Sequence, residues 1–209
     1  SLVCVENTSN LGGGSCYDQE VFDEIARVAK SLGCATHIDG ARIFNASIAT
    51  GVDVARMCEH YDSVSICFSK GLGAPVGSVL VGSSAFIAKA HRWRKMFGGG
   101  WRQAGMLASA CLYALDHHVD RMSEDHERAR RIATMLNDLP MFTVDMDTVQ
   151  TNMIYAHTAE PAAKVVEQFA ANGVDMFDLS ENRLRVVVHL HITDEDVERF
   201  TEISQRLFG

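Results

Sequence analysis

The chain has 209 residues, 47% of them hydrophobic, so it can bury a sizeable core as one large and one small domain. Its formal net charge is -8 and its 19 Lys and Arg are scattered, which argues against nucleic acid as a partner. No apolar run reaches the roughly 18 residues of a membrane helix, and the six cysteines are too far apart for a disulfide or zinc pattern, so we expect a cytoplasmic protein without a membrane or metal site.

The first half of the chain alternates short apolar strands with helices. Apolar residues recur at helical spacing from 18 to 32, and Gly33 follows in the position of a helix C-cap. In chain order the pattern predicts strands at 2–5, 35–39, 63–68 and 78–81 and helices at 18–32 and 53–60. This alternation is typical of parallel α/β units, in which ligands bind beyond the carboxyl ends of the strands.

The second half begins with two long helices, which the pattern predicts at 105–115 and 125–139. It continues with strands at 142–144, 152–155 and 184–189 and helices at 161–172 and 194–207. We therefore expect an α/β protein with a domain boundary between residues 120 and 140, which divides it into 1–125 and 126–209.

Lys70 follows the predicted strand at 63–68 and opens a turn rich in glycine, Ser69–Gly77. A lysine held there and partly desolvated would more readily lose its proton, as an amine must before it attacks an aldehyde. A solvated surface lysine on a loop is an equally good interpretation of this motif taken alone.

Asp39 also ends a predicted strand, and Arg42 follows it closely. We expect Asp39 to be buried, which is costly for a carboxylate unless it is paired. The protonated pyridine nitrogen of pyridoxal phosphate is a suitable partner. Arg42 could reach the phenolate oxygen of the same ring, although a plain ion pair between Asp39 and Arg42 needs no cofactor.

Four motifs in order carry a resemblance to a known family. They are residues 39–46, 69–78, 92–95 and 98–105, and the interval from Asp39 to Lys70 is 70 − 39 = 31 residues. These motifs and this interval resemble the low-specificity L-threonine aldolases, pyridoxal-phosphate enzymes with an aspartate aminotransferase-like fold. The resemblance runs from Glu6 to Leu190 and lacks the amino-terminal third of the family.

The resemblance implies a role for each residue at the cofactor. Lys70 would form the Schiff base, Asp39 would pair with the pyridine nitrogen, and Arg42 would contact the phenolate oxygen. Arg102, which follows three glycines, would bind the cofactor phosphate across a subunit interface, although the same arginine could cap a helix.

Two further residues would bind the substrate. Arg185 matches the family arginine that grips the substrate carboxylate, and Lys95 matches a second lysine near the active site. For Lys95 a solvated basic helix face is the stronger alternative. Ser9 stands where family members often carry histidine, so no acid or base role is assigned there.

The resemblance also implies a fold and an activity. Residues 1–125 would form part of a fold type I large domain with a mainly parallel sheet, and 126–209 a small α+β domain. The protein would be a carbon–carbon lyase that cleaves L-threonine or L-allo-threonine to glycine and acetaldehyde, as a homotetramer with shared sites. A related β-eliminating lyase and a truncated, non-catalytic fragment are the two alternatives.

Overall fold

The computed structural model describes residues 1–209, which form two compact units. Unit 1 consists of Ser1–Thr8 and Cys16–Asp120, and unit 2 of Ser9–Ser15 and Arg121–Gly209. The boundary expected after residue 125 falls within α6 (Met122–Asn137), which belongs entirely to unit 2. No helix is long and apolar enough to cross a membrane.

Unit 1 is built on a four-stranded sheet in the order β1-β2-β3-β4. Its strands are β1 (Leu2–Glu6), β2 (Ala35–Asp39), β3 (Ser63–Cys67) and β4 (Ser78–Gly82). The first three are parallel, and β4 is antiparallel to β3. The short connection between β3 and β4 contains no crossover helix, so the chain can only return as a hairpin. The expected α/β class with a mainly parallel sheet is confirmed.

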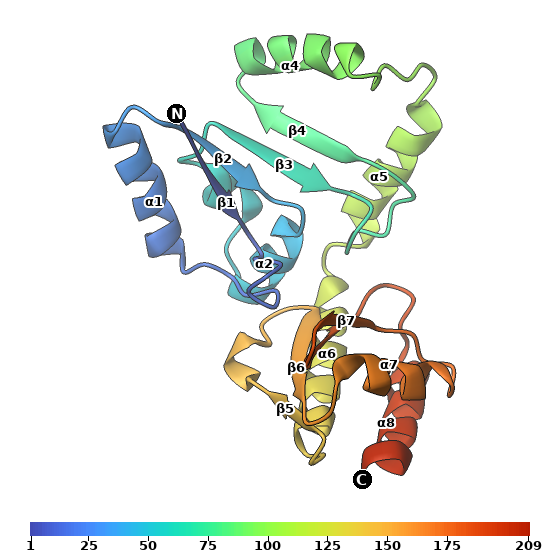
Figure 1. The fold of residues 1–209 in the computed structure, drawn as a ribbon. Coiled ribbons are helices and arrows are strands. Elements are labelled where there is room, and N and C mark those ends of the chain that lie inside the picture. The colour runs from blue at the N-terminus through green and yellow to red at the C-terminus, as the bar shows by residue number, and fades with distance from the viewer. The chain divides into compact units, whose positions relative to one another are not determined.

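Helices cover one face of this sheet. The helices of unit 1 are α1 (Gln19–Ser31), α2 (Ile43–Thr50), α3 (Val54–Cys58), α4 (Ser84–Met96) and α5 (Gly105–His117). Side chains from α1, α2 and α3 pack on the inward-facing residues Val5, Ile38 and Val64 of the first three strands. Figure 1 shows α1 beside β1 and β2 and α4 beyond β4. α2 is not among the expected elements, because its apolar residues form no one-sided stripe.

Much apolar surface of unit 1 stays uncovered. The outer edges of β1 and β4 pair with no strand. Along β4 only Gly82 is even half-buried, α4 buries no side chain, and α5 buries only Ala114. The large exposed apolar side chains on and near α4 and α5 are Phe86, Trp93, Met96, Phe97, Trp101, Met106, Leu112 and Tyr113. Open strand edges and apolar patches of this extent mark surfaces that another chain or segment covers.

Unit 2 contains an antiparallel sheet in the order β5-β6-β8-β7. Its elements are α6, β5 (Phe142–Val144), the short 3-10 helix η1 (Met146–Thr148), β6 (Met153–Thr158), α7 (Ala162–Ala170), β7 (Phe177–Ser180), β8 (Arg183–Val187) and α8 (Asp194–Phe208). α6, α7 and α8 share one apolar core with the sheet. Two hydrogen bonds fasten the Ser9–Ser15 segment to this unit: Thr151 Oγ1 donates to Gly14 O at 2.7 Å and Tyr155 OH to Asn10 O at 2.5 Å.

Candidate active site

Asp39 and Lys70 follow neighbouring parallel strands. Asp39 is the last residue of β2 and pairs in register with Ser65 of β3, while Lys70 comes shortly after Cys67, the end of β3. Carboxyl ends of parallel strands meet at one edge of a sheet, so the two motifs share that edge. Gly40 lets them approach closely, since a Cβ there would lie 2.9 Å from Val64 Cγ2.

The Asp39 carboxylate is exposed, not buried as the sequence predicted. It lies on the sheet face opposite the helices, as the alternation with buried Ile38 requires. Ala41 N–H donates to Asp39 Oδ1 at 3.1 Å, while Oδ2 accepts no hydrogen bond. Arg42 is half-buried and precedes the first turn of α2. One carboxylate oxygen is thus available to a ligand.

Lys70 is exposed too, and its side chain makes no hydrogen bond or ion pair. The burial expected for Lys70 is therefore absent, because its side chain points into solvent. The backbone of the turn is well ordered: Gly73 N–H donates to Lys70 O at 2.8 Å and Phe68 N–H to Gly77 O at 3.0 Å. Gly73 and Gly77 have φ values of 69° and 105°, which favour glycine. The Lys70 amine is therefore accessible on a defined loop.

The residues after β1 extend this edge of the sheet. Glu6 pairs in register with Asp39, and Asn7 N–H donates to Asp39 O at 3.0 Å. Asn7 Oδ1 and Thr8 Oγ1 are buried without a hydrogen-bond partner. Buried polar atoms usually have one, so this end of β1 has hydrogen-bonding capacity that the chain leaves unused.

Arg102 and Lys95 lie at the connection between α4 and α5. Both are exposed, and neither side chain forms a hydrogen bond or ion pair. The glycines before Arg102 end α4: Gly98 N–H donates to Lys95 O at 3.2 Å and Gly99 N–H to Arg94 O at 2.8 Å. These glycines therefore serve helix termination, and an exposed arginine follows them.

Arg185 lies in unit 2, on the face of the sheet opposite the buried Leu184. Its guanidinium lies 5.8 Å from the centre of the Phe177 ring, and its Nε is buried without a partner. Arg183, which the sequence reasoning missed, has a similar environment: it lies 4.9 Å from the Tyr155 ring centre, also with an unpartnered Nε. The two-residue spacing along a strand was the available signal. Neither arginine forms an ion pair, so both could bind an anion.

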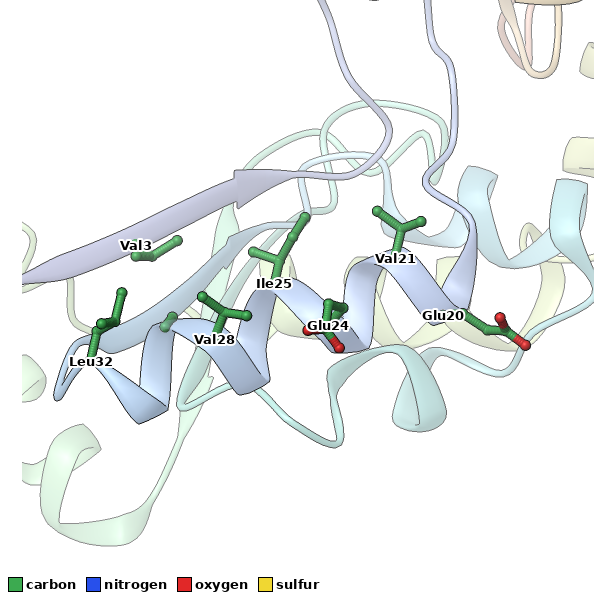
Figure 2. Close-up of a pocket in the computed structure, with 8 residues that line it drawn as sticks. Val3, Glu20, Val21, Glu24, Ile25, Val28 and Leu32 are labelled. Carbon is green, nitrogen blue, oxygen red and sulfur yellow. The ribbon is translucent and has the colours of Figure 1, made fainter.

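None of these residues lines either of two surface grooves. A groove of about 600 Å³ runs along α1 and is lined by Val3, Val21, Ile25, Val28 and Leu32 among others (Figure 2). A second, of about 570 Å³, lies between α6 and α8. The α1 groove is lined mainly by apolar side chains, and its charged lining residues are Glu20 and Glu24 from α1 itself. It contains none of the residues that the motifs single out, so we assign the chemistry to the strand ends instead. No group of three His, Cys, Asp or Glu is arranged to hold a metal ion.

Burial disfavours thiolate chemistry at Cys16 and Cys58. None of the six cysteines forms a disulfide, and burial raises the pKa of the Cys16 and Cys58 thiols to about 11. A thiol with such a pKa stays protonated near neutral pH and is a poor nucleophile. Lys70 is the better candidate for covalent chemistry.

Comparisons with known proteins agree on one family and one fold. The family described as beta-eliminating lyase matches residues 1–159. Low-specificity L-threonine aldolase 1 of Arabidopsis thaliana is 44% identical over 94% of this chain and 56% of its own length. The corresponding Escherichia coli K12 enzyme is 38% identical, over 94% of this chain and 57% of its own length.

The fold is found in solved structures. The threonine aldolase of Leishmania major superposes with a TM-score of 0.79 at 18% identity, over 99% of this chain and 60% of that one. A serine palmitoyltransferase of Sphingomonas wittichii gives a TM-score of 0.71 at 18% identity, over 100% of this chain and 56% of that one. This chain thus spans less than two thirds of the length of the proteins it matches.

Proposed function

The chain belongs to the beta-eliminating lyase family, and we propose that it is the lysine-bearing part of a pyridoxal-phosphate-dependent threonine aldolase. The reaction is cleavage of L-threonine or L-allo-threonine to glycine and acetaldehyde. The observation that carries this proposal is the meeting of Asp39 and Lys70 at adjacent parallel strand ends, each with an unused functional group. Relatives named low-specificity L-threonine aldolases supply the substrate class.

The residues present fit the cofactor. Asp39 has a carboxylate oxygen that accepts no hydrogen bond, which suits a protonated ring nitrogen. The Lys70 amine is unpaired and can bond covalently to the cofactor aldehyde. Arg42 would contact the phenolate oxygen and Arg102 the phosphate, since a guanidinium fork matches both.

When bound, pyridoxal phosphate supplies an electron-accepting ring that stabilises the negative charge left on the substrate Cα after the Cα–Cβ bond breaks. Asp39 would keep the ring nitrogen protonated, and so keep the ring electron-poor. Arg185 would hold the substrate carboxylate, and Lys95 would add positive charge for the same anionic substrate. In the overall reaction the substrate hydroxyl would lose its proton to a base and Cα would receive one proton, so that acetaldehyde and glycine together account for all atoms of threonine.

We propose that, in the active enzyme, other polypeptide covers part of the surface that these 209 residues leave exposed. The open edges of β1 and β4 and the exposed side chains of α4 and α5 support this. A homotetramer with shared sites would cover part of that surface, and Arg102 would then act across an interface. A non-catalytic fragment remains the alternative for the chain on its own.

One experiment tests the covalent role of Lys70. The full-length protein is incubated with pyridoxal phosphate, reduced with borohydride and digested, and the modified lysine is located by mass spectrometry. We expect the adduct on Lys70, its loss in Lys70→Ala, and its retention in Lys89→Ala, which removes an exposed lysine on α4. An adduct confined to other lysines would contradict the proposal.

Product analysis separates the two lyase reactions. The description of the matching family makes β-elimination the second candidate reaction. With L-threonine, aldol cleavage gives acetaldehyde and glycine, whereas elimination gives ammonia and 2-oxobutanoate. We expect the first pair, and the second pair would replace the proposed reaction with elimination.

A further inference from the structure

The end of α5 is tied to the turn that carries Lys70. His118, which follows α5, has its Nδ1 2.7 Å from the carbonyl oxygen of Leu72, two residues after Lys70. A carbonyl oxygen can only accept, so Nδ1 carries the proton in this hydrogen bond.

The backbone of the turn sets the position from which the flexible Lys70 side chain extends. The Lys70 side chain makes no hydrogen bond or ion pair of its own. The turn is closed by Gly73 N–H donating to Lys70 O and by Ala74 N–H donating to Phe68 O at 2.9 Å. Leu72, 1% exposed, anchors the turn through its side chain. The Leu72 carbonyl oxygen of the same turn accepts the hydrogen bond from the His118 side chain.

A single face of α5 runs along this loop. Cys111 Sγ lies 3.8 Å from Val76 O, and Ala114 is the buried residue of the helix. Cys111, Ala114 and His118 follow at i, i+3 and i+7, so they lie on one face. Tyr113 meets the His118 ring edge-on at 5.5 Å between centroids, which restrains the ring orientation.

We propose that His118 is a positioning residue for Lys70. By holding the Leu72 carbonyl, it fixes the 70–73 turn and hence the place from which the Lys70 amine reaches the cofactor aldehyde. This inference rests on the proposed role of Lys70. A misplaced reactive group can cost on the order of 100-fold in rate without any loss of stability.

The test compares three variants of the full-length protein. His118→Leu removes the donor, and His118→Asn keeps an N–H that can reach a carbonyl. His117→Leu is the matched control, because His117 contacts only Tyr113 of its own helix, through Nδ1 to Tyr113 O and through ring stacking at 4.0 Å, against which a leucine can still pack. Backbone hydrogen exchange at Gly73 and Ala74 reports on the turn without cofactor, and borohydride-trapped adduct on Lys70 reports on amine placement.

In His118→Leu we expect Gly73 to exchange about 10-fold faster. The adduct on Lys70 should form about 10-fold more slowly, and kcat should fall with little change in KM. His118→Asn should recover most of each effect, and His117→Leu should match the wild type. If His118→Leu does not fold, the comparison of His118→Asn with His118→Gln, whose longer amide cannot keep the same geometry, takes its place.

Two outcomes overturn the inference in different ways. Wild-type protein without any adduct on Lys70 would remove the proposed function and this inference with it. A normal adduct on Lys70, together with unchanged Gly73 exchange and adduct formation in a folded His118→Leu, would overturn only the positioning role.

Discussion

The backbone N–H of Gly40 donates a hydrogen bond to the carbonyl oxygen of Ser65 at 2.8 Å. This bond joins the turn after Asp39 to the strand that leads to Lys70. It is possible because Gly40 has no side chain: a Cβ would meet Ser65 O at 3.0 Å and Ile43 Cβ at 3.2 Å. The distance between the two site residues therefore depends on a glycine.

Gly40→Ala should separate the two strand ends. We expect destabilisation of about 1–3 kcal/mol from overpacking, together with less trapped adduct on Lys70. Gly105→Ala is the control, since a Cβ there meets nothing within 4 Å. Urea unfolding measures stability, and mass spectrometry measures the adduct. Equal stability of Gly40→Ala and the wild type would contradict this account of the turn.

Arg185 and Arg183 offer a matched pair for substrate binding. Arg185→Gln should raise KM for L-threonine about 10- to 100-fold, because a charge-assisted hydrogen bond contributes about 1.5–3 kcal/mol. The adduct on Lys70 should form normally. Arg183→Gln removes a similar guanidinium from the same face of β8 and should change KM by less than about 3-fold. A larger effect of Arg183→Gln would transfer the carboxylate role to Arg183.

The ion pair between Arg121 and Asp125 should stabilise unit 2 strongly. Arg121 donates to both oxygens of the Asp125 carboxylate, at 2.6 and 3.1 Å, and the Asp125 side chain is 0% exposed. Arg121→Met leaves a buried carboxylate unpaired and should cost about 3–5 kcal/mol. Lys164→Met, which breaks an exposed pair with Glu160, should cost less than about 1 kcal/mol in the same denaturation assay. If the two variants lost similar unfolding free energy, the ion pair of Arg121 and Asp125 would not be the strong stabilising contact proposed here.

His126 should make stability depend on pH in mildly acidic solution. Burial lowers its pKa from 6.5 to about 4, so the unfolded chain takes up a proton that the folded chain does not. Stability is fully present above pH 6.5 and falls as the pH drops through about 4. We expect the urea midpoint of His126→Gln to depend less on pH than that of the wild type when it is measured at several pH values across this window. If the urea midpoint of the variant depended on pH as strongly as that of the wild type, the acid destabilisation would come from other groups.

This window is separate from that of the paired carboxylates. Arg56 lowers the pKa of Asp23, and hydrogen bonds from Thr36 lower that of Asp62, in each case from 3.8. Their contributions are present above pH 3.8 and are lost as the pH falls below it. The acid loss between pH 6.5 and 4 thus reports mainly on His126.

Strands and amphipathic helices were predictable where their pattern is local. Apolar runs and glycine C-caps indicated β2, β3 and α1, because periodicity reflects the face that each element buries. The antiparallel direction of β4 depends on the closure of the Phe68–Gly77 loop, which no periodicity encodes. The helix α2 was missed because its residues are apolar on several sides.

The sequence by itself determined the motifs at Asp39 and Lys70. Because the expected family and chemistry depend on residue type and spacing, they could be predicted from these motifs. Only the tertiary structure decided that both side chains are exposed and that His118 contacts the turn of Lys70. Exposure and hydrogen bonds across 46 residues of sequence depend on how distant segments pack. Such packing has no signature in local spacing.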